Sequence, residues 1–207
     1  MSRKRYPLRI PRHAAGIRAQ MPRTLAGRSW WCRRWSAALE AMGLGARLGR
    51  GRNYALSGQV TALEFERESR PGRPPCCRVL ARVTGTRSEP YAVTLDFRAP
   101  PAAARARIIA ALRAEPMLLA RLLADDLPME VEEIFRAEGI DLFPGGRIEP
   151  PSPRRYDMVC DCTCPDYANP CKHTTAVLML LGEEVARRPL TLIELRGITL
   201  EELVDED

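Results

Sequence analysis

The sequence predicts an α+β fold, in which an antiparallel β-sheet region is joined to a helical insertion and to a C-terminal β-turn-α unit. The sheet is predicted because three segments alternate β-branched or aromatic residues with other residues at a period of two: 60–65, 78–83 and 91–97. The insertion is predicted because the apolar pattern becomes helical between residues 102 and 139. The C-terminal unit is predicted from cysteines and a histidine that crowd residues 160–173, ahead of an apolar helical stripe.

Composition and charge limit the classes of function. The chain has 207 residues, of which 45% are apolar and 28% charged, which is ordinary for a folded protein. No apolar run approaches the roughly 18 residues of a membrane span, so we expect no membrane partner and a cytoplasmic location. The net charge is +6, and residues 1–55 hold thirteen Lys or Arg against the single acid Glu40. This basic N-terminal region suits an anionic partner, although the base composition of the genome would produce part of the same excess of Arg.

Residues 1–28 are expected to form a disordered basic arm. They contain no acidic residue, show little periodicity and include several Pro and Gly. Such an arm can bind an anionic polymer. A transit peptide is the alternative, since it is also Arg-rich and acid-poor, but the prolines oppose an amphipathic helix.

A helix and then strands are expected over residues 29–100. Ser29 can cap a helix that runs to about Met42, with Gly43 placed to end it. Trp31 and Trp35 share one face, which we expect to be core, with base stacking as the alternative. The glycine-rich segment that follows is expected to be a loop leading into the strands. Its arginines are the predicted nucleic-acid contacts: Arg47, Arg50 and Arg52.

The helical insertion and its linker occupy residues 101–153. Pro116 suits the first position of its second helix, and Asp126 can cap a third helix that ends at Gly139. Three glutamates near the start of that third helix complement its positive end. They have no His, Lys or metal partner close in sequence, so a catalytic carboxylate pair is disfavoured and we expect no enzyme.

The last segment, residues 154–207, contains a predicted zinc site. Cys162-x-Cys164 followed by Cys171-x-His173 supplies three thiolates and an imidazole, the ligands that a tetrahedral structural zinc prefers. Cys171 should close the turn and His173 should open the helix, because two residues 200° apart on a helix cannot face one ion. Cys160 lies two residues before Cys162, so a shifted ligand set is the alternative.

Disulfide bonding and nucleophilic catalysis account less well for these cysteines. Disulfide bonds need an oxidising compartment, and we expect no secretory signal for this chain. A nucleophilic Cys171–His173 pair would need a third, orienting group and an open cleft. After the helix, residues 182–189 are expected to break the pattern, and Thr191 with Glu194 and Thr199 with Glu202 have capping-box spacing.

The run CPDYANPCKH, with CxC before it and CxH at its end, resembles the SWIM-type zinc finger. The resemblance implies that Cys162, Cys164, Cys171 and His173 ligate one Zn²⁺. The patterns RGRxYxxxGxV and VxGxRxxPY resemble the segment that precedes the zinc motif in bacterial SWIM-containing proteins, which extends the likeness over most of residues 24–204.

The resemblance also implies a class of function. SWIM-like domains are associated with bacterial SWI/SNF-type helicases, transposases and chromatin-related proteins, and bind DNA or protein. We therefore expect a zinc-binding accessory module that binds nucleic acid. The alternative is a protein-protein adaptor for a SWI/SNF-type helicase without direct DNA contact. The sequence has no Gly-rich phosphate loop with Lys, so the chain is not expected to be the motor itself.

Overall fold

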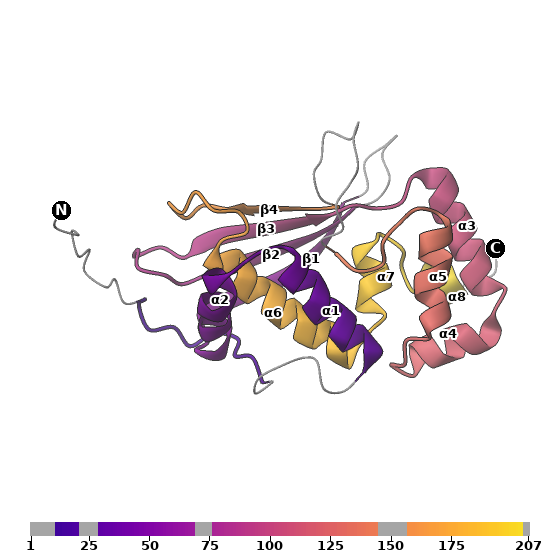
Figure 1. Cartoon of the computed structure of the whole chain (residues 1–207), viewed down its shortest axis with the longest axis horizontal. Helices are drawn as coiled ribbons and strands as arrows, with labels where there is room; N and C mark the ends of the chain where they lie inside the picture. The colour runs from indigo at the N-terminus through magenta and orange to yellow at the C-terminus, as the bar shows by residue number, and fades with distance from the viewer. Residues whose placement is uncertain (1–10, 21–28, 69–75, 145–156, 205–207) are drawn as a thin grey trace.

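A four-stranded antiparallel sheet forms the centre of the fold, which confirms the predicted α+β class. The computed structural model describes residues 11–20, 29–68, 76–144 and 157–204. The strands lie in the order β1-β2-β3-β4, so each pairs with its neighbour in sequence (Figure 1). Their bounds are β1 Val60–Glu68, β2 Cys76–Val83, β3 Tyr91–Phe97 and β4 Met158–Cys162.

The two faces of the sheet differ in burial. Every second residue of β3 from Tyr91 to Phe97 is buried, and the residues between them are half-buried. The register carries this alternation into β4, where Cys160 lies opposite Leu95 and Met158 opposite Phe97. One face of the sheet therefore forms the core, as the period-two pattern predicted.

Three helices cover the buried face: α1 Trp30–Ala41, α2 Ala46–Leu56 and α6 Lys172–Arg187. Figure 1 shows α6 running along the sheet, with α1 and α2 beside it. The Ser29 hydroxyl caps α1 by accepting a hydrogen bond from the Cys32 amide at 3.4 Å, as predicted. Trp35 is completely buried and Trp31 half-buried, so this face of α1 is core.

Helix α2 corrects the expectation of an arginine-rich loop at residues 47–52. Glycine disfavours a helix by its intrinsic propensity, yet Gly51 is helical and buried against α6. A Cβ atom on Gly51 would lie 2.5 Å from the Thr175 Cβ and 2.9 Å from the Lys172 carbonyl oxygen. The glycine is therefore needed for close helix packing, and this tertiary contact outweighs its low helix propensity of about 1 kcal/mol.

The remaining helices gather at the end of the sheet farthest from α2 (Figure 1). They are α3 Ala102–Arg113, α4 Pro116–Leu123, α5 Met129–Ala137, α7 Thr191–Leu195 and α8 Glu201–Val204. Pro116 opens α4 as predicted. The N-cap of α5 is Pro128 rather than the expected Asp126, whose carboxylate accepts a hydrogen bond from Arg121 instead.

Arg196 ties three separate segments together next to the end of β3 and the start of β4. Its side chain is 1% exposed and donates hydrogen bonds to the carbonyl oxygens of Arg98, Leu142 and Phe143. It also pairs with the Asp157 carboxylate at 2.5 Å. Because a buried charge is costly unless paired and hydrogen-bonded, this network fixes the approach to β4.

Parts of the chain expected to be irregular are paired with the core. Within the expected arm of residues 1–28, residues 11–20 lie along the sheet: Ile17 bridges Val60, and the Gln20 amide donates to Glu183 at 3.0 Å. The rest of that arm lies outside the described residues. Helix α6 continues through Gly182, where a break was expected, because Val185 beyond it is fully buried.

One of the two expected capping boxes forms. The Thr199 amide donates to Glu202 at 2.9 Å and the Glu202 amide donates to the Thr199 hydroxyl at 3.3 Å. The box expected at Thr191 is absent, because Glu194 pairs with Arg188 instead.

Among the described residues, no helix combines the length and apolar character needed to cross a membrane.

Candidate metal centre

The candidate metal centre lies where β4 ends and α6 begins. β4 ends at Cys162, and the following Thr163 still pairs with β3, since its amide donates to the Ala92 carbonyl at 3.0 Å. The chain then turns back. Asp166 accepts a hydrogen bond from the Ala168 amide at 3.1 Å, and the Asn169 side chain donates to the Cys160 carbonyl at 2.6 Å. These contacts return the chain beside the strand it has just left.

Cys171 is the N-cap of α6, and this confirms the predicted arrangement of turn and helix. Its sulfur accepts a hydrogen bond from the Thr174 amide at 3.5 Å, and its carbonyl accepts one from the Thr175 amide at 2.9 Å. The positive end of the helix stabilises a negative charge on this sulfur. His173 lies in the first turn, as expected.

The structure brings the four predicted ligands together. The ligand atoms of Cys162, Cys164, Cys171 and His173 all lie within 4.8 Å of one another. His173 Nδ1 lies 3.7 Å from the Cys171 sulfur and 3.8 Å from the Cys162 sulfur. Two ligands of one tetrahedral zinc, with Zn–S about 2.3 Å and Zn–N about 2.0 Å, are roughly 3.5 to 3.8 Å apart. The donor set and its spacing therefore fit zinc.

The protonation of the thiols differs across the cluster. A hydrogen bond with Cys162 lowers the pKa of the Cys171 thiol far below its ordinary value, and contacts with His173 and Thr174 act in the same direction. The same hydrogen bond, with burial, raises the pKa of Cys162. Cys171 is thus the first of the pair to carry the charge that a metal requires.

Cys160 lies outside the group of four. Burial, followed by the charge of Cys171, raises its pKa to about 12, so it remains a neutral thiol. Its side chain is 8% exposed and belongs to the hydrophobic core opposite Leu95. The alternative ligand set, shifted to include Cys160, is therefore not the one that the structure assembles.

Aromatic rings hold His173 in place, and this feature was not predicted. The Tyr91 ring packs on the imidazole with centroids 4.6 Å apart, and Tyr54 meets it edge-on at 5.2 Å. His173 is 3% exposed, and its Nε2 atom has no hydrogen-bond partner among the described residues. A Cβ on Gly85 would lie 2.3 Å from Tyr91 Cε2, so only glycine lets Tyr91 reach the imidazole.

The residues around His173 do have a sequence signature. Gly51 and Tyr54 belong to the pattern RGRxYxxxGxV, while Gly85 and Tyr91 belong to VxGxRxxPY. In this chain, residues of both patterns contribute to the packing around His173 and the start of α6.

Two basic side chains lie over the tyrosine rings that pack on His173. Lys172 Nζ lies 5.4 Å from the centre of the Tyr54 ring, and the Arg87 guanidinium lies 5.7 Å from that of Tyr91. Burial, followed by the nearby Tyr91, raises the pKa of Tyr54, so its hydroxyl stays neutral. The three arginines predicted from the sequence lie on α2, which packs against α6: Arg47, Arg50 and Arg52. Arg50 is exposed, and the other two are half-buried.

Comparison with known proteins agrees with this geometry. Residues 155–182 match the family model of the SWIM zinc finger, so the chain carries a zinc finger of this type, as its Cys/His spacing predicted. The chain is 35% identical over 189 residues to "Uncharacterized protein Rv2102" of Mycobacterium tuberculosis. The match covers 91% of this chain and 62% of the relative, so the chain spans less than two thirds of the relative's length. No solved structure matches the chain significantly.

Proposed function

We propose that Cys162, Cys164, Cys171 and His173 ligate one zinc ion, and that the chain is a zinc-stabilised module, not an enzyme, that binds nucleic acid. Three thiolates and one imidazole complete a tetrahedral shell, which leaves no position for a substrate. The metal's contribution is structural, because it links the end of β4 to the start of α6. The observation that carries the proposal is that cations lie over the two tyrosine rings that pack on His173.

Zinc binding and the position of the cations are connected through the two tyrosines. Tyr54 and Tyr91 pack on the ligand His173, and the same rings carry Lys172 and Arg87. Arg50 flanks Gly51, which touches the first turn of α6. When zinc fixes the position of His173, the tyrosines and the cations that lie over them are therefore fixed as well. Positive charges at fixed spacing suit binding to a phosphate backbone.

An aromatic residue on the zinc loop supports the same function. Tyr167, between Cys164 and Cys171, is 101% exposed, so its ring makes no packing contact that would explain it. An exposed ring beside a basic surface can stack on an unpaired base, which contributes about 1–3 kcal/mol. DNA is the expected ligand.

The salt dependence of DNA binding tests the proposal. If about six phosphates are neutralised, the slope of log K against log salt is about −5, and affinity falls steeply between roughly 50 and 200 mM salt. Replacing Arg50, Arg87 and Lys172 by Gln should reduce the slope by about 2 to 3. Replacing Arg121, Arg136 and Arg187 by Gln changes the net charge equally at sites where each arginine pairs with a carboxylate, and should leave the slope almost unchanged.

The basic arm needs a shorter deletion than the sequence suggested. Residues 11–20 pair with the sheet, so removing residues 1–28 would damage the fold. Removing residues 1–10 takes away four cations and should flatten the slope while zinc content stays the same. The competing hypothesis, an adaptor for a SWI/SNF-type helicase without DNA contact, predicts no gel shift even at about 50 mM salt. That result would end the nucleic-acid proposal.

A further inference from the structure

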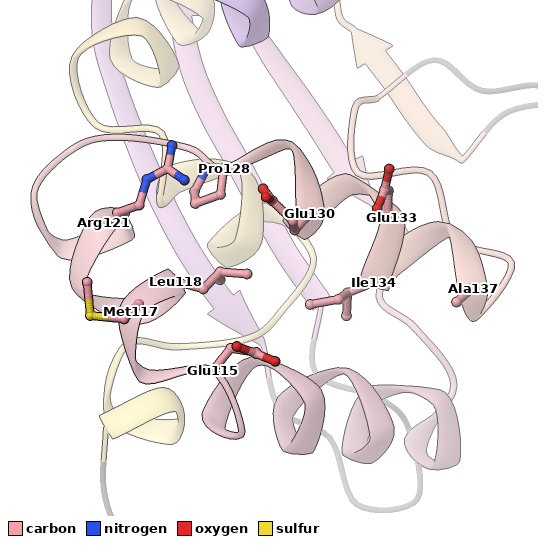
Figure 2. A pocket seen from close by; sticks show the side chains of 9 residues that line it. All are labelled: Glu115, Met117, Leu118, Arg121, Pro128, Glu130, Glu133, Ile134 and Ala137. Atoms are coloured by element: carbon pink, nitrogen blue, oxygen red, sulfur yellow. The ribbon is translucent and has the colours of Figure 1, made fainter.

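The helical end of the molecule contains a hollow, far from the zinc centre. It lies between α4 and α5 and has a volume of about 540 Å³. Figure 2 shows Leu118 from α4 and Ile134 from α5 pointing toward each other across it. Pro128 and Ala137 also line it, so its floor is apolar. The hollow opens to solvent, and some of the side chains that line it are exposed.

One of these side chains is unusually exposed for an apolar residue. Met117 lines the hollow and is 76% exposed, although α4 has buried positions at Leu118 and Leu122. An unbranched thioether adapts to differently shaped partners, and exposed methionines are common on surfaces that bind helices. The rim therefore offers an apolar contact with no partner inside the described chain.

The charge on the rim is opposite to that of the whole molecule. Glu115, Glu130 and Glu133 line the hollow, and none of them forms an ion pair with a described residue. The single lining cation, Arg121, is held by Asp126 at 2.8 Å. Figure 2 places Glu115 on one side of the Leu118–Ile134 floor and Glu130 and Glu133 on the other. A chain with a net charge of +6 thus presents a negative rim here, which repels nucleic acid.

We propose that this groove binds a basic amphipathic helix of a partner protein. An apolar floor between two carboxylate rims matches a helix that places aliphatic side chains at i, i+3/i+4 and i+7 and Arg or Lys on both flanks. A small-molecule site would need polar groups converging inside the hollow, whereas the polar groups here stand at its rim. Because the groove and the zinc centre lie at opposite ends of the molecule (Figure 1), one chain can hold this partner and a nucleic acid together.

The probe is a synthetic 18-residue peptide with Leu at helical spacing, Arg on both flanks, blocked ends and a fluorescent label. Anisotropy with the full, zinc-loaded chain at about 50 mM salt should give a Kd on the order of tens of micromolar, typical of a transient interface. The same peptide with Glu in place of Arg should bind at least tenfold more weakly. Amide shifts in an NMR titration should concentrate in residues 115–137. A Kd above about 1 mM, or equal binding of the acidic peptide, overturns the proposal.

Matched variants assign the binding to the groove. Exchanging Glu115, Glu130 and Glu133 for Gln should weaken binding about tenfold. The control changes three exposed glutamates outside the groove to Gln, namely Glu40, Glu64 and Glu89, and should alter Kd less than twofold. If both triple variants weaken binding equally, the attraction comes from net charge and the groove proposal fails.

A second pair of variants tests the apolar contact without risk to the fold. Met117→Ala removes a lining side chain, and Leu123→Ala removes a side chain of the same helix that is 52% exposed and does not line the hollow. Only Met117→Ala should weaken peptide binding, by about three- to fivefold. An equal effect of Leu123→Ala would contradict the assigned site.

Discussion

The sulfur of Cys171 serves the fold in two ways at once. It accepts a hydrogen bond from the Thr174 amide at the start of α6, as the side chain of a serine or aspartate N-cap would. It is also one of the four candidate metal ligands. The positive helix end that favours a cap also favours the thiolate that zinc requires. One atom therefore joins helix formation to metal binding.

Substitutions at this position can separate the two roles. Cys171→Ser keeps a capping oxygen but loses the soft ligand, whereas Cys171→Ala loses both. We expect both variants to lose most of their zinc, measured by metal analysis of the purified chains. In the metal-free state, Cys171→Ser should be more stable than Cys171→Ala by about 1 kcal/mol, as in other N-cap replacements, measured by denaturant unfolding.

Cys160 provides the matched control for this experiment. Its thiol is buried and neutral outside the cluster, so Cys160→Ala should retain the zinc and lose only about 1 kcal/mol of stability through a small cavity. If Cys160→Ala lost as much zinc as Cys164→Ala, the ligand register would be displaced by two residues.

At the scale of elements, the contact between α2 and α6 depends on one glycine. Gly51→Ala would force a Cβ against Thr175 and the Lys172 carbonyl, so we expect α2 to shift and stability to fall by about 1–3 kcal/mol. Gly49→Ala is the control on the same helix, where a new Cβ meets nothing within 4 Å. It should be neutral or stabilising by up to about 1 kcal/mol, measured by thermal unfolding. Equal destabilisation by both variants would show that the loss is not specific to the close contact between Gly51 and α6.

The helices and strands also differ in how well the sequence alone predicts them. The strands and the Cys/His unit were predictable because alternation and ligand spacing are local patterns. Helix α2 was not, because the partner that makes Gly51 favourable lies far along the chain at Thr175. The aromatic packing on His173 was missed for the same reason. Nor does any local pattern place Glu115 and Glu133 on the rim of one groove, since the packing of both α4 and α5 against α3 brings them together.

At the scale of the whole molecule, zinc removal should have a large effect. Structural zinc contributes about 10–16 kcal/mol of apparent binding energy, which exceeds the typical 5–15 kcal/mol stability of a domain. The centre joins an edge strand to α6, the helix that covers the sheet. We therefore expect chelation to lower the melting temperature sharply and to reduce the far-UV helical signal. Unchanged melting with a chelator present would show that the fold does not depend on the metal.

The position of β4 in the sheet has a consequence for how the chain folds. β1, β2 and β3 follow one another and can pair early, whereas Phe97 of β3 meets Met158 of β4 only after the whole helical insertion has been made. Closing so long a loop is slow, so β4 should join last. Until it does, β3 is an unpaired edge that other chains can extend. Zinc captured between β4 and α6 would then shorten the time for which this edge is open, and zinc supply during synthesis would decide how much of the chain aggregates.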